Sequence, residues 1–97
     1  MTNLIKGEKR KIGVVVTSQY PFAIDHATYN VKTSLKKQIG DKGYCIIDGG
    51  TAYFLCDTNK GVYKSDRSYL AYISIAIAGG AEFITGIAEI TVRSKGD

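Results

Sequence analysis

The segment from Tyr69 to Arg93 constrains the fold more than any other part of the chain. Between Ile73 and Ala78, isoleucine alternates with alanine or serine, so bulky apolar residues recur at every second position. This period places successive side chains on opposite faces of a β-sheet. From Gly86 onward, small or apolar residues again alternate with polar ones. The segment is therefore predicted to form two long antiparallel strands, joined by a two-residue turn at Gly79-Gly80.

A helix over residues 67–78, with Gly79 as its C-terminal stop, is the alternative for the first half of this segment. It would give the order β-α-β-β-α-β, which is ferredoxin-like. The strand is favoured because a helix would place Ile75 outside the apolar stripe.

A helix is predicted over residues 25–39. Asp25 suits its N-cap, and Gly40 is placed to end it. Four apolar residues recur every four positions and would form the buried stripe, namely Ala27, Val31, Leu35 and Ile39.

Further strands are predicted over residues 11–18, 44–47 and 51–56, with Asp48-Gly49-Gly50 as a hairpin turn. The predicted fold class is therefore α+β, with a single helix packed on a curled antiparallel sheet in the order β-α-β-β-β-β. One domain would span residues 11–97, after a flexible basic segment at residues 1–10. This order resembles the architecture of cystatins and other small helix-on-sheet proteins. The chain has neither the Gln-x-Val-x-Gly loop nor the Pro-Trp loop of cystatins, so the resemblance carries over no functional residue.

Composition is that of an ordinary globular domain, with 97 residues, 44% hydrophobic and 23% charged. The N-terminus lacks the apolar core of a signal peptide, so we expect a cytoplasmic protein with reduced cysteines. The longest uncharged run, Ser68 to Ala81, is shorter than the ~20 residues that a membrane helix needs. We therefore expect no membrane association.

Cys45 and Cys56 are the first candidates for chemistry, as a disulfide, a metal pair or a nucleophile. Together with His26, the sole histidine, they leave a tetrahedral zinc site one ligand short. A two-residue turn at Gly49-Gly50 would pair Cys45 with Phe54, whereas a longer loop would bring the two cysteines together. We favour two inert buried thiols, and expect no catalytic residues, metal or cofactor, because no set of nucleophile, base and oxyanion donor is visible.

The first hypothesis for function is a non-enzymatic interaction module, acting as an inhibitor or adaptor. It would bind a protein partner, or another copy of itself as a homo-oligomer, through a sheet edge or face. Tyrosine is enriched at such contacts, and a last strand at a sheet edge would offer free backbone groups for pairing. The predicted interface residues are Tyr63, Tyr69, Tyr72, Glu82, Glu89 and Arg93.

The alternative hypothesis is a nucleic-acid-binding module that uses a basic and aromatic helix face. The chain carries a net charge of +4, and basic residues beside an aromatic ring can pair with phosphates and stack on bases. The predicted contacts are Lys9, Arg10, Lys11, Tyr29, Lys32, Lys36 and Lys37. A small cysteine-dependent enzyme is the third hypothesis.

Overall fold

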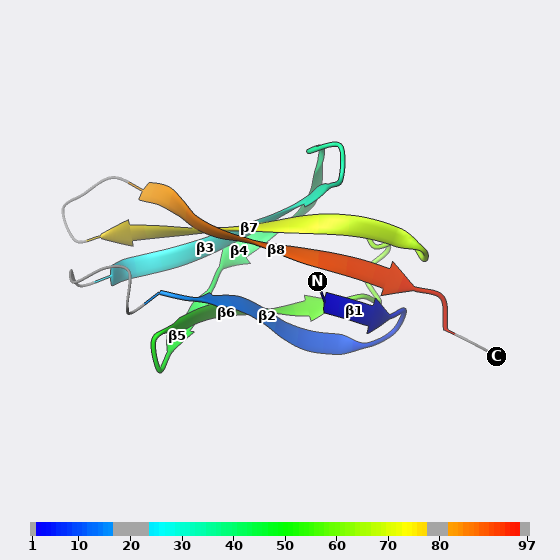
Figure 1. Ribbon diagram of the computed structural model, residues 1–97, viewed down its shortest axis with the longest axis horizontal. Helices are drawn as coiled ribbons and strands as arrows, with labels where there is room; N and C mark the ends of the chain where they lie inside the picture. The colour runs from blue at the N-terminus through cyan, green and yellow to red at the C-terminus, as the bar shows by residue number, and fades with distance from the viewer. Residues whose placement is uncertain (1, 17–23, 78–81, 96–97) are drawn as a thin grey trace.

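Every regular element is a β-strand in the part that the computed structural model describes, which is residues 2–16, 24–77 and 82–95. The strands are β1 (Thr2–Ile5), β2 (Lys9–Val15), β3 (Ile24–Thr33), β4 (Gln38–Tyr44), β5 (Ile46–Asp48), β6 (Thr51–Asp57), β7 (Arg67–Ile77) and β8 (Glu82–Arg93). They form two facing sheets, the layers of a β-sandwich (Figure 1). Sheet A has the order β1-β8-β7-β3-β4, and sheet B has the order β2-β6-β5.

The strand interpretation of residues 67–77 is confirmed, and the helix alternative is wrong. β7 pairs antiparallel with β8 from Arg67 opposite Val92 to Ala76 opposite Glu82. Ile73 and Ile75 are fully buried on its inner face, as the two-residue period predicts. The predicted turn at Gly79-Gly80 lies outside the described residues.

The predicted helix over residues 25–39 is wrong, because these residues form β3, a turn and the start of β4. A spacing of four is close to the helical period, but it is also a multiple of the strand period of two. Ala27 and Val31 are therefore buried on one face of a strand, while Leu35 is 79% exposed in the turn. Lys36 has φ 65°, and the amide of Thr33 donates to the carbonyl of Lys37 at 2.8 Å, which closes the turn.

This correction changes the fold class. The α+β fold with the order β-α-β-β-β-β is replaced by an all-β sandwich, and the ferredoxin-like alternative is replaced with it. The resemblance to cystatins depended on the helix and is withdrawn.

The hairpin at Asp48-Gly49-Gly50 is confirmed, with a two-residue turn. Asp48 pairs with Thr51, and both turn glycines have positive φ, at 57° and 83°. The same register places Ile46 opposite Tyr53, so the two cysteines do not face each other across the strands. Cys45 and Cys56 are both free.

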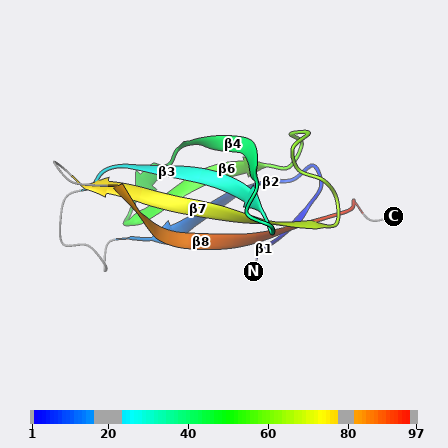
Figure 2. The ribbon, with the colours of Figure 1, turned by 90° about the horizontal axis from the view of Figure 1, so that it is seen from above.

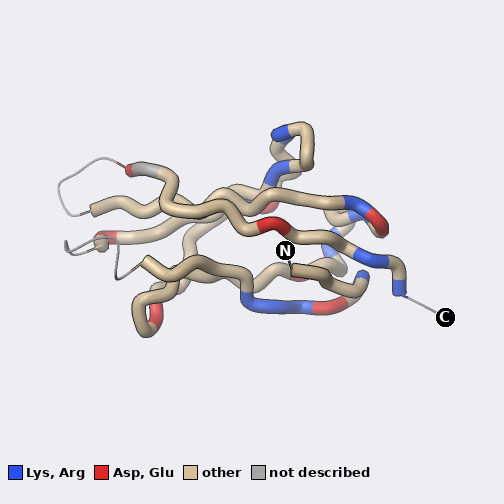
Figure 3. Tube along the Cα trace, viewed as in Figure 1, with Lys and Arg blue, Asp and Glu red and all other residues tan. Residues whose placement is uncertain are grey.

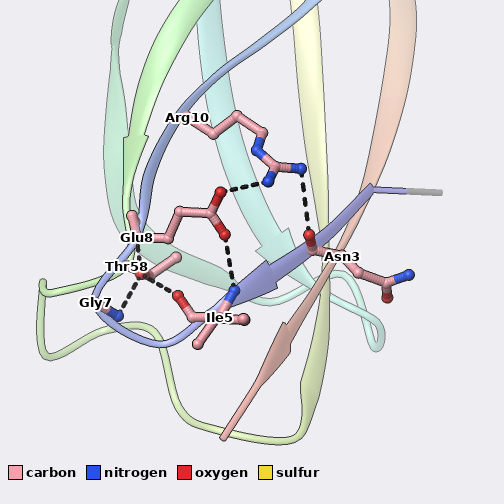
Figure 4. A network of polar contacts seen from close by, with 6 residues as sticks. All are labelled: Asn3, Ile5, Gly7, Glu8, Arg10 and Thr58. Atoms are coloured by element: carbon pink, nitrogen blue, oxygen red, sulfur yellow. Dashed lines mark hydrogen bonds and ion pairs between the residues drawn. The ribbon is translucent and has the colours of Figure 1, made fainter. Parts of the chain in front are cut away.

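The N-terminal residues are tied to both sheets. β1 pairs in parallel with the last four residues of β8, beside which it lies in Figure 2. Lys6 then donates through Nζ to the carbonyl oxygen of Thr58 at 2.6 Å and also to that of Tyr63. Fully buried Thr58 accepts from the amide of Gly7 at 2.8 Å and donates to the carbonyl of Glu8 at 2.7 Å (Figure 4). These contacts join residues of the segment 1–10, predicted from the sequence to be flexible, to residues far along the chain.

The core fills the space between the inner faces of the two sheets. Ile73, Ile75 and Ile90 of sheet A and Ile12 of sheet B are buried in it. The ring of Tyr29 on β3 stacks on that of Phe54 on β6, with centroids 3.9 Å apart and planes at 6°. This stack links the two layers through the apolar area that both rings bury. Among the described residues, no helix is long and apolar enough to cross a membrane.

Candidate functional site

The predicted interface residues divide between the core and the outer surface of sheet A. Tyr63 and Tyr69 are buried, with ring centroids 5.2 Å apart, so they do not belong to the surface. Tyr72 lies between buried Ala71 and Ile73 on β7 and therefore points outward. Glu82, Glu89 and Arg93 of β8 are exposed. The structure thus brings Tyr72 and these charged residues together on two adjacent strands.

Cross-strand pairing arranges the outward residues of sheet A in rows, which we call face A. One row runs from β4 to β8 through Lys42, Asn30, Tyr72 and Ile87. The next row runs through Tyr44, Thr28, Ser74 and Ile84. Glu82 lies beyond the second row on β8, and Glu89 lies beyond the first.

Face A exposes several large apolar side chains. Tyr44 is 76% exposed, Ile84 is 57% exposed and Ile87 is 49% exposed. Ile84 and Ile87 are three positions apart, which in a regular strand would place them on opposite faces. A bulge in β8 puts them opposite Ser74 and Tyr72, so both lie on the same face. None of these residues except Tyr72 was identified from the sequence.

A shallow depression of about 490 Å³ lies in face A. Its lining includes Tyr44, Tyr72, Lys42 and Glu82. Thr28 donates to the carboxylate of Glu82 at 2.9 Å. The ammonium group of Lys32 lies 4.4 Å from the centre of the Tyr72 ring, a cation–π contact that holds the ring in place. The depression therefore combines three tyrosines, of which Tyr29 is the third, with one basic and one acidic group.

The residues of the nucleic-acid hypothesis do not share one face. Lys9, Arg10 and Lys11 lie on β2 of sheet B, whereas Lys32 points outward from sheet A. Figure 3 shows the basic segments of β2 and of the turn between β3 and β4, which holds Lys36 and Lys37, on opposite sides of the molecule. Tyr29 turns inward onto Phe54. The set does not form the single basic and aromatic surface on which that hypothesis depends.

A buried polar cluster surrounds Asp41 on edge strand β4. Asp41 of β4 is buried, and it accepts hydrogen bonds from the hydroxyl of Tyr63, from the hydroxyl of Tyr29 at 3.3 Å and from Nζ of Lys60 at 3.1 Å. Burial, followed by the hydrogen bond to Asp41, raises the pKa of Tyr63. The hydrogen bond to Asp41 also raises the pKa of Lys60. Because every donor serves the same carboxylate, we interpret this cluster as structural.

His26 and Asp25 form a contact that the predicted helix would have prevented. Nδ1 of His26 lies 2.7 Å from Oδ2 of Asp25, and the His26 ring meets Tyr44 edge-on with centroids 5.6 Å apart. Both side chains of this contact are substantially exposed. Exposed ion pairs contribute little to stability, so the pair orients the imidazole beside face A rather than stabilising the fold.

The cysteines are expected to react slowly in the folded protein. Burial raises the pKa of Cys45 to about 11, which leaves about one hundredth of the thiolate of an exposed cysteine at pH 8. Burial also raises the pKa of Cys56. Alkylation of native Cys45 at pH 8 should therefore be about 100-fold slower than in urea, with each thiol followed by peptide mass spectrometry. The native rate should keep rising with pH up to about 11. Equal native and unfolded rates would contradict this prediction and favour the thiol-enzyme hypothesis.

No group of three or more histidine, cysteine, aspartate or glutamate side chains is placed to hold a metal ion in the described ranges 2–16, 24–77 and 82–95. No family model, curated protein or solved structure matches the chain.

Proposed function

We propose that the chain is a non-enzymatic interaction module that binds a protein partner through face A. The observation that carries the proposal is the exposure of Ile84, Ile87 and Tyr44 on one sheet face, around a depression that contains Tyr72. Scattered exposed apolar residues are normal, but neighbouring ones on a single face are typical of interaction sites.

The distribution of side chains on face A also resembles that of a protein interface. Such interfaces have an aromatic and aliphatic centre, with charged residues at the rim. Here Tyr72 occupies an inner position of its row, whereas Lys42 lies on edge strand β4 and Glu82 and Glu89 flank the rows on β8. The face, rather than a strand edge, carries the proposal because β1 already occupies the last residues of β8.

The proposal is tested by affinity capture with matched variants. The double variant Ile84→Lys/Ile87→Lys places two charges in face A. The control variant Ile46→Lys/Leu55→Lys makes the same change on strands of sheet B, at side chains that are 58% and 55% exposed. Each immobilised bait is offered an extract of the source cells together with a tagged second copy of the chain.

We expect wild type and control to retain the same protein. The face A variant should retain at least about tenfold less of it, because a charge buried without a partner is strongly unfavourable. Circular dichroism confirms that each bait is folded. Retention by the face A variant, loss by the control alone, or no retained protein with any bait would contradict the proposal.

A further inference from the structure

We infer that the partner of face A is a second copy of this chain, related by a two-fold axis parallel to the strands. The inference rests on the proposed function and names the partner of the same face. Most soluble oligomers are closed homo-oligomers, and a two-fold interface requires a surface that is complementary to itself. Face A satisfies this requirement in both its charge and its apolar pattern.

Rotation about an axis parallel to the strands keeps each position along a strand and exchanges the two sides of the sheet. With the axis between β3 and β7, β4 of one copy faces β8 of the other, and β3 faces β7. The row that contains Tyr44 and Ile84 then places Tyr44 of one copy over Ile84 of the second copy. The exposed tyrosine and isoleucine therefore cover each other twice in the dimer.

The charges of face A are separated across the same axis. Lys42 lies on β4 at one side, and Glu89 lies on β8 at the other. In the dimer, Lys42 faces Ile87 of the second copy, and Glu89 of that copy lies two residues further along β8. Two residues of a strand span about 7 Å, which a lysine side chain can bridge. Complementary charge of this kind favours one relative orientation over others.

The size of the face suits a stable dimer. Across this axis four strands face their counterparts, and four strands about 4.8 Å apart with about ten residues of about 3.4 Å each give a flat area of roughly 650 Å². An interface of standard size buries about 800 Å² of accessible surface per partner, and accessible surface exceeds flat area because side chains project. A second copy would thus cover face A without requiring any other part of the chain.

Exchange of charge between two variants tests this geometry directly. Lys42→Glu brings two glutamates together twice in its own dimer, and Glu89→Lys brings two lysines together twice. When the two variants are mixed, both contacts again join opposite charges. Association of each variant, of the mixture and of wild type is measured by sedimentation over a range of concentrations, with differently labelled chains to detect mixed dimers.

We expect each variant alone to dimerise at least about tenfold more weakly than wild type, and the mixture to form mixed dimers within about threefold of wild-type affinity. A change that only disturbed folding would not be corrected by mixing. The inference would be overturned if the single variants dimerised as tightly as wild type, or if the mixture dimerised as weakly as its components. In either case, loss of the dimer in Ile84→Lys/Ile87→Lys would still support the use of face A. A wild type that is monomeric at every concentration would overturn the inference alone, because the capture experiment tests the proposed function separately.

Discussion

Replacing Asp41 by alanine is expected to lower the free energy of unfolding by about 4 kcal/mol, because it removes the acceptor that a buried polar cluster shares. The hydroxyls of Tyr63 and Tyr29 and the ammonium of Lys60 all donate to this carboxylate. Lys60 is partly exposed and can turn to water, whereas Tyr63 is fully buried and loses its partner. With a denaturant slope of about 1.5 kcal/mol/M, the urea midpoint should fall by roughly 2–3 M.

Two further variants make this result specific. Tyr63→Phe keeps the packed ring and removes one donor, so we expect a loss of about 1–2 kcal/mol. Asp25→Ala removes an exposed carboxylate, and the change should stay within about 1 kcal/mol. If Asp41→Ala and Asp25→Ala had similar midpoints, the interpretation of the cluster as a stabilising one would be wrong.

Replacing Gly13 by alanine is expected to cost about 3 kcal/mol or more, because there is no room for a methyl group between β2 and β6. A Cβ atom at this position would lie 2.3 Å from the carbonyl oxygen of Ala52 and 2.7 Å from Cβ of Tyr53. These atoms belong to β6 itself, and Gly13 pairs directly with Tyr53. The two strands would have to separate, which weakens the pairing of β2 with the central strand β6 of sheet B.

Gly61 provides the matched control for this substitution. No atom lies within 4 Å of a Cβ atom built there, and the residue is exposed. Gly61→Ala should leave the thermal midpoint unchanged or raise it slightly, because alanine restricts the unfolded chain. Equal midpoints for the two alanine variants would show that β2 and β6 can adjust without cost.

The parts of the fold that could be predicted from the sequence are those whose pattern fits only one period. Ile73, Ile75 and Ile77 are spaced by two, which a helix would distribute around its surface. The sequence Asp48-Gly49-Gly50 similarly indicates a tight turn by its chemistry alone. Both elements occur in the structure as predicted.

The region of residues 24–44 could not be assigned in the same way, because its apolar spacing of four fits both periods. The residues between Ala27 and Val31 carried the better signal. Thr28 and Tyr29 are residue types that favour strands. Tyr29 also lies midway between Ala27 and Val31, and all three side chains face inward as a period of two predicts. Lys36 and Lys37 suit the end of a helix, but here they lie in the turn that joins β3 to β4.

The candidate site was predictable only where it follows the regular alternation of β7. Tyr72 falls on the face opposite the isoleucines, and the same rule places Tyr69 inside with them. The bulge in β8 that brings Ile84 and Ile87 to one face breaks this rule, and Gly86 beside it is of a residue type that often marks a bulge within a strand. Lys42 and Tyr44 belong to face A only because β4 pairs with β3. The helix predicted over residues 25–39 excludes this pairing, so the pairing was not predicted from the sequence.

The parallel pairing of β1 with β8 has a consequence for how the protein is made. Thr2 to Ile5 pair with Ile90 to Arg93, so β1 needs a strand that is synthesised much later than itself to complete its hydrogen bonds. Contacts between such distant positions close slowly, since much of the chain must be ordered before they form. Until residues 90–93 have been synthesised, Leu4 has no strand to pair with. The backbone amide of Lys6 likewise has no carbonyl of Arg93 to which it can donate. Assembly of the full sandwich therefore has to wait until β8 has been synthesised.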